Sequence, residues 1–162
     1  MKRPCAIRIG HCCLVFALLV SQFALAQEQN SMTQTARGTF TVNLQPAADA
    51  EVDDGISLGR MTLDKVFEGD LVGTGKGTML TAQVATEGSA AYVAIERVRG
   101  SLGGRQGSFV FQHVGTMTRS GRELSIRVVP DSGTGELVGL SGSFNLTVKD
   151  GVHHYSFEYT LP

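Results

Sequence analysis

The stretch AYVAIERVRGSLGGRQGSFVFQHVGTM, residues 91–117, decides the fold of this chain. Apolar and polar side chains alternate on both sides of a glycine-rich segment at 100–107, a pattern typical of two antiparallel strands joined by a short link. If the strands pair symmetrically, the numbers of facing residues sum to about 207. Ala94 then faces His113, and Glu96 faces Phe111. The stretch therefore predicts a β-hairpin with a defined register.

The same alternation recurs along the rest of the chain in segments of roughly 7–11 residues separated by glycine-rich turns. No helical pattern is longer than about two turns. About eight strands in so short a chain favour closure, because a closed sheet has no exposed edge. We therefore predict an all-β fold, a closed antiparallel barrel of about eight strands over residues 37–162, with a β-sandwich as the alternative.

Residues 1–26 are predicted to be a secretory signal peptide. Lys2, Arg3 and Arg8 supply a basic start, and the apolar run CLVFALLVSQFALA at 13–26 ends in a small-residue cleavage pattern. This run is too short to span a membrane. Residues 27–36 are polar and lack apolar periodicity, which predicts a disordered lead-in. Cleavage near Ala26 would place the mature protein in the periplasm or outside the cell.

The composition of the expected mature chain narrows its chemistry. All three cysteines lie before the cleavage position, so no disulfide and no thiolate site is expected. Loss of three basic residues with the signal leaves 11 basic and 15 acidic residues, a net charge of −4. Without a basic stripe we expect no nucleic-acid partner. We expect no cofactor and no metal site, because the adjacent His153 and His154 would point to opposite faces of a strand.

One face of the predicted hairpin carries side chains suited to a functional site. The candidate ligand-binding residues are Tyr92, Glu96, Phe109, Phe111 and His113. Glu96 and His113 are also the candidate catalytic residues, because a carboxylate and an imidazole in an apolar pocket suit proton transfer. Burial would raise the pKa of Glu96, and pairing with His113 would oppose that rise.

Two alternatives remain open for this face. The opposite face of the hairpin is equally apolar and could form the interior instead; it carries Val93, Ile95, Val110 and Val114. Glu96 and His113 could also be a purely structural pair.

Several blocks along the chain resemble one bacterial family. They are Leu58-Gly59-Arg60-Met61, Tyr92-Val93-Ala94-Ile95-Glu96-Arg97, Gly107-Ser108-Phe109-Val110-Phe111-Gln112-His113, the run at 129–137 and the C-terminal run at 155–162. Together they are similar to the DUF3224 domain proteins, a family of uncharacterised function, over residues 35–162. The resemblance implies an allene-oxide-cyclase-like barrel, a fold class also seen in plant dirigent proteins. It implies no reaction.

Three functions are compatible with these features. The first is binding of a small apolar ligand inside the barrel, since eight strands enclose room for one such ligand. The second is a cofactor-independent isomerase or cyclase like allene oxide cyclase, in which the barrel holds a reactive substrate in one conformation. The third is a structural envelope protein without a ligand. The sequence does not decide whether the protein is an enzyme, and a homo-oligomer is compatible with all three functions.

Overall fold

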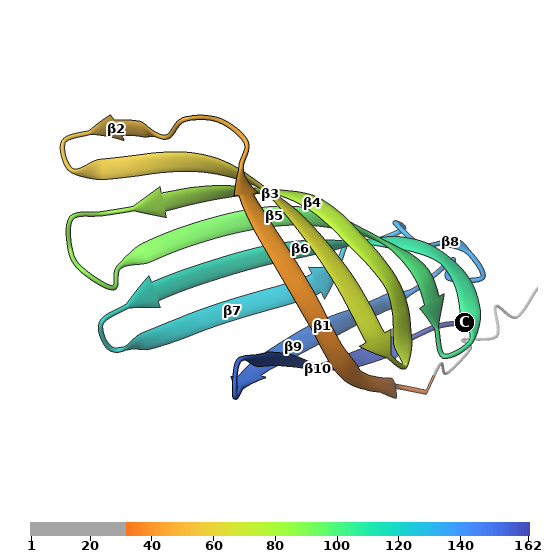
Figure 1. Ribbon diagram of the computed structural model, residues 1–162. Helices are drawn as coiled ribbons and strands as arrows, with labels where there is room; N and C mark the ends of the chain where they lie inside the picture. The colour runs from red at the N-terminus through yellow and green to blue at the C-terminus, as the bar shows by residue number, and fades with distance from the viewer. Residues whose placement is uncertain (1–31) are drawn as a thin grey trace, which may run out of the picture.

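The computed structural model describes residues 32–162, so the predicted signal peptide lies outside the described residues. Residues 32–162 form ten strands and no helix, and therefore contain no helix able to cross a membrane. The strands are β1 (Gln34–Pro46), β2 (Glu51–Asp53), β3 (Ile56–Gly69), β4 (Leu71–Gln83), β5 (Ala90–Leu102), β6 (Arg105–Thr118), β7 (Gly121–Val128), β8 (Thr134–Gly135), β9 (Ser141–Lys149) and β10 (Val152–Thr160). Figure 1 shows the long strands wrapped around a common interior.

The barrel closes because β1 pairs with two strands at once. Residues 34–40 of β1 pair with β10, and residues 38–46 pair with β3. The other neighbours follow in the order β10-β9-β7-β6-β5-β4-β3, so eight antiparallel strands complete the ring once the short strands β2 and β8 are set aside. This arrangement confirms the predicted closed antiparallel barrel and excludes the sandwich.

The first strand begins earlier than its sequence indicates. Gln34 and Ala36 were expected in a disordered lead-in, but both lie in β1 and pair with Tyr159 and Phe157 of β10. Ala36 is buried in the core. The prediction is wrong for these residues because strand pairing with a distant segment fixes them, and a single small apolar residue gives no local periodicity.

The hairpin of β5 and β6 has the register that its sequence predicts. Ala94 pairs with His113, and Glu96 pairs with Phe111. The face that carries Glu96 points into the barrel, whereas Val93 on the other face is half exposed. The alternation therefore places the candidate residues inside, and the alternative with the valine-rich face inside is wrong.

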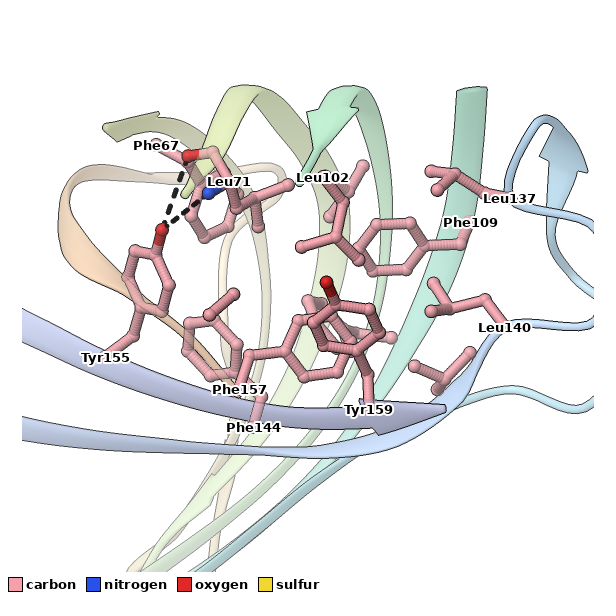
Figure 2. Close-up of a cluster of buried hydrophobic side chains, with 14 of the residues drawn as sticks. Phe67, Leu71, Leu102, Phe109, Leu137, Leu140, Phe144, Tyr155, Phe157 and Tyr159 are labelled. Carbon is pink, nitrogen blue, oxygen red and sulfur yellow. Dashed lines mark hydrogen bonds between the residues drawn. The ribbon is translucent and has the colours of Figure 1, made fainter. Parts of the chain in front are cut away.

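An aromatic core fills one half of the barrel (Figure 2). The rings of Phe111 and Phe157 lie 5.4 Å apart at 73°, and those of Phe144 and Tyr155 stack at 5.2 Å. The Tyr155 hydroxyl accepts a hydrogen bond of 2.9 Å from the backbone N–H of Leu71, which ties β10 to the start of β4 across the barrel. Edge-to-face and offset contacts of this kind stabilise a core beyond the area they bury.

The other half of the barrel holds a smaller core cluster, Leu63, Met79 and Ala94, and is open beyond it. Strands β7 and β9 share a single pair, Arg127↔Ser143, so they separate beyond it, and Figure 1 shows β3 to β7 extending past the β9–β10 hairpin. Inward positions near this end are consequently exposed to solvent: the exposed fraction is 41% for Leu124 and 58% for Val148. We call this region the open end; its inward side chains are Leu44, Met61, Tyr92, Met117, Leu124, Leu146 and Val148.

Candidate functional site

Three ionisable side chains meet inside the barrel, between the aromatic core and the open end. Lys65 comes from β3, Glu96 from β5 and His113 from β6, and all three are buried. We call them the ionic triad. Buried charges are rare unless they are paired, because leaving water is costly. The contact between three buried ionisable groups therefore makes the triad the candidate functional site in the interior.

One carboxylate oxygen of Glu96 holds the triad together. Lys65 Nζ donates a hydrogen bond of 2.8 Å to Glu96 Oε2. His113 Nε2 lies 3.0 Å from the same oxygen, but the contact is poorly aligned with the N–H direction and is not a regular hydrogen bond. The other oxygen, Glu96 Oε1, is buried and has no hydrogen-bond partner in residues 32–162. Glu96 thus combines a strong ion pair with one unsatisfied acceptor.

A glycine on the strand between Lys65 and Glu96 lets their side chains meet. Gly75 of β4 is the register partner of Lys65 and is buried. A Cβ atom at Gly75 would collide with Glu96 Oε1 and come within 3.1 Å of the Phe67 ring. The absence of a side chain at this position leaves the space that the carboxylate occupies. The glycine-rich sequence of β4 therefore contributes to the site without bearing any functional group.

Aromatic rings support the ammonium group of Lys65 from the side of the core. Lys65 Nζ lies 4.9 Å from the ring centroid of Phe40 and 5.7 Å from that of Phe67. Such cation–π contacts partly offset the loss of hydration when a lysine is buried. The triad is therefore anchored to the aromatic core.

The environment lowers the pKa of Glu96 from its ordinary value of 4.5. Burial is the largest single influence and raises the pKa, but the contacts with His113 and the charge and hydrogen bond of Lys65 together outweigh it. The sequence indicated the contributions of burial and of His113 correctly. It did not indicate Lys65, which supplies much of the opposing effect.

This lowered pKa predicts how stability depends on pH. The folded protein favours the charged carboxylate, so the contribution of Glu96 is complete above its unfolded pKa and is lost as pH falls through the folded value. We expect urea unfolding to show a loss of stability below about pH 4.5 that is smaller in Glu96→Gln, which cannot titrate. Asp64→Asn, which alters an exposed pair with Lys76, should lose stability with falling pH as wild type does. An equal loss of stability with falling pH in wild type and in Glu96→Gln would contradict the lowered pKa of Glu96.

The structure separates the five candidate ligand-binding residues into three sets. Phe109 and Phe111 are almost fully buried and pack edge to face at 4.9 Å, so they belong to the filled aromatic half. Tyr92 lies at the open end, where its ring covers Gly115, and partial burial raises the pKa of its hydroxyl. Glu96 and His113 lie between these groups. The sequence correctly placed these side chains on one face of the hairpin but did not indicate how far along the barrel each one lies.

Lys65 is the member of the triad that the sequence analysis missed. The sequence did contain an indication of its position, because Lys65 alternates along the strand with the same period as the inward-pointing Met61, Leu63 and Phe67. A lone lysine in phase with buried apolar residues predicts a buried charge that needs a partner. Identifying that partner requires the register from β3 to β5, which no local pattern supplies.

Two surface hollows accompany these features, and neither is lined by the triad. One, of about 490 Å³, lies on the outer face of β1, β10 and β9. The other, of about 330 Å³, lies where β1 leaves β10, beside Phe40 and His153. Within residues 32–162, no group of three or more histidine, aspartate or glutamate side chains is arranged to hold a metal ion.

The fold and the site define a small closed β-barrel with a buried ionic triad below an open apolar end. The chain belongs to the DUF3224 family, described as proteins of unknown function, whose profile matches residues 36–159. It is 47% identical to a DUF3224 protein of unknown function from Shewanella oneidensis MR-1, whose crystal structure matches with a TM-score of 0.76 over 81% of this chain and 99% of that chain. No curated protein matches the chain. The family resemblance is therefore confirmed.

Proposed function

We propose that this protein binds one small, mostly apolar ligand at the open end of its barrel, above the ionic triad. The observation that carries the proposal is the exposure of apolar side chains at positions that point inward. Leu124 lies on the same face of β7 as the buried Ile126, and Val148 lies on the same face of β9 as the buried Phe144, yet their exposed fractions are 41% and 58%. Covering such inward, water-exposed apolar side chains with a ligand is favourable, because it removes apolar surface from water.

The polar groups nearby suggest how such a ligand would be oriented. Tyr92 packs against the Leu63, Met79 and Ala94 cluster and carries a hydroxyl group. Glu96 and His113 lie deeper on the same inner face of the hairpin. Binding sites of this kind combine a mostly apolar lining with a few polar groups that fix orientation. A fatty acid or a terpenoid alcohol has the corresponding shape, an apolar body with one polar end.

A second candidate function rests on Glu96 Oε1. This buried acceptor has no partner within residues 32–162, and a carboxylate oxygen without a partner can accept a proton from a bound substrate. That chemistry would suit the cofactor-independent isomerase or cyclase considered from the sequence. It requires the substrate to reach below Tyr92, because Glu96 is fully buried.

Thermal-shift titration with oleate and farnesol tests the binding proposal. We expect a saturable rise in Tm with at least one of them. Leu124→Arg, at the open end, should abolish the shift, whereas Val72→Arg, at an exposed outward position of β4, should retain it. Absence of a saturable shift with both compounds, or an unchanged shift in Leu124→Arg, would contradict the proposal and favour the structural envelope protein.

The Glu96→Gln variant distinguishes the two candidates. If the protein only binds a ligand, Glu96→Gln should still bind it, because the lining of the open end is intact. The affinity should be weaker, because the charged group that helps to orient the polar end of the ligand is lost. Turnover of a substrate should instead be abolished, because the amide cannot accept the proton.

We also propose that residues 1–26 direct export and are removed. N-terminal sequencing of the protein recovered from a cell envelope or culture fraction should then begin near Gln27. A mature chain that still begins at Met1 would contradict this proposal.

A further inference from the structure

The hollow on the outer face of β1, β10 and β9 carries an ordered set of polar side chains. Three neighbouring strands contribute two residues each, and the strand registers place them in two rows. The rows are Arg37–Ser156–Asn145 and Thr39–His154–Thr147. Facing side chains in adjacent strands lie about 5 Å apart and diagonal ones about 7 Å apart, so one small ligand can contact several of them at once.

The side chains of this set all offer hydrogen-bond donors, and all but Arg37 also offer an acceptor. Arg37 supplies a guanidinium, His154 an imidazole and Asn145 an amide, and the other three side chains supply hydroxyl groups. No aspartate or glutamate lines the hollow. Two glutamates lie at the edge of the set: Glu158 is the next outward residue of β10 after Ser156, and Glu68 of β3 is the register partner of Thr39. Neither forms an ion pair with Arg37 in the described part of the chain. The guanidinium of Arg37 therefore supplies the fixed positive charge, and the other groups can donate to an anion or pair with hydroxyl groups.

These donors are available to a ligand. Among the side-chain hydrogen bonds of residues 32–162, none uses the side chains of these six residues, although the backbone N–H of Arg37 donates to Asp70 Oδ2 at 2.8 Å. Ser156 and Thr39 are nevertheless partly buried within the hollow. Arg37, Asn145, Thr147 and His154 are exposed, so all six groups can be reached from solvent. A ligand that accepts several hydrogen bonds would give the two partly buried hydroxyl groups partners that the protein does not supply.

From this arrangement we infer that the outer hollow is a binding site for an oxyanion carried on a polyhydroxy body, a phosphate or sulfate ester of a sugar. Arg37 binds two oxygens of the anion through its planar fork, and His154 lies diagonally opposite across the two strands. At about 490 Å³ the hollow exceeds the size of the anion alone, and the amide and hydroxyl groups of β9 and β10 lie where hydroxyls of the body would be placed.

The site is separate from the open end. The six side chains point outward from β1, β10 and β9, whereas Tyr155 and Phe157, which alternate with them on β10, point into the core. Binding here does not depend on the interior being accessible. Failure of the ligand proposal for the open end would leave this inference unaffected, and the reverse is also true.

Titrations followed by NMR shifts of the backbone amides test this inference. Glucose 6-phosphate and glucose 6-sulfate are the probes, and glucose is the uncharged control. We expect saturable shifts at residues 37–39, 145–147 and 154–156 with at least one ester, and weak or no shifts with glucose. Binding of one ester alone would identify which anion the site prefers and would support the site in either case.

Arg37→Ala should weaken ester binding at least tenfold, because it removes the bidentate charged contact. Arg97→Ala is the matched control, since Arg97 is also exposed on the outer face, on β5, and should leave binding unchanged. Arg37→Lys should bind the ester more tightly than Arg37→Ala but less tightly than wild type, because lysine keeps the charge but cannot make the bidentate contact of a guanidinium. Glucose binding as strong as the esters, undiminished ester binding in Arg37→Ala, or no saturable shift with either ester would overturn the inference.

Discussion

Replacement of Lys65 by methionine should lower the free energy of unfolding by about 3–5 kcal/mol. The change leaves the Glu96 carboxylate buried with only the poorly aligned contact to His113. Removing one partner of a buried pair costs far more than the pair contributes, because the remaining charge stays out of water. Urea denaturation at pH 7 measures the loss.

An exposed ion pair in the same sheet provides the control for this variant. Lys76 lies 3.1 Å from Asp64, and their side chains are 81% and 49% exposed. Lys76→Met should therefore change stability by less than about 1 kcal/mol. If the two methionine variants lose similar stability, the buried pair does not hold a desolvated charge as the structure indicates.

The double variant Lys65→Met/Glu96→Leu separates the desolvation cost from packing. With both charges removed and apolar volume retained, we expect the double variant to recover most of the stability lost by Lys65→Met. A triad retained for function rather than for stability would give this result. Further loss in the double variant would instead show that the ion pair itself stabilises the barrel.

The hairpin and the triad show what the sequence could and could not determine. The register of β5 and β6 follows from local information, because strict alternation flanks a symmetrical link, and it correctly brought Glu96 and His113 to one face. Lys65 could not be added, because its contact with Glu96 crosses β4 and depends on two further registers.

The open end was likewise hidden from the sequence. Leu124 and Val148 have the alternation of core residues, and only the separation of β7 from β9 leaves them exposed. Periodicity identifies the face to which a side chain points. Burial depends in addition on whether another strand lies opposite, so a pattern that predicts the core also includes the lining of an opening.

Gly75→Ala should destabilise the protein by about 3 kcal/mol, an effect near the upper end of those seen when a packed interior receives one extra carbon. The new Cβ would occupy the position of Glu96 Oε1 and press on Phe67, and the carboxylate would be displaced from Lys65. The backbone at Gly75 does not itself require glycine, since its φ is not in the left-handed region. The cost therefore arises from the collision and the disturbed ion pair.

Gly121→Ala is the matched control, because Gly121 has an ordinary φ and no atom within 4 Å of the position a Cβ would take. It should change stability by no more than about 0.5 kcal/mol. The acid dependence supplies an independent measurement: displacement of the carboxylate from Lys65 should make the loss of stability below about pH 4.5 smaller in Gly75→Ala than in wild type. A wild-type acid profile combined with wild-type stability would show that the carboxylate does not need the space beside Gly75, and that Glu96 Oε1 lies elsewhere.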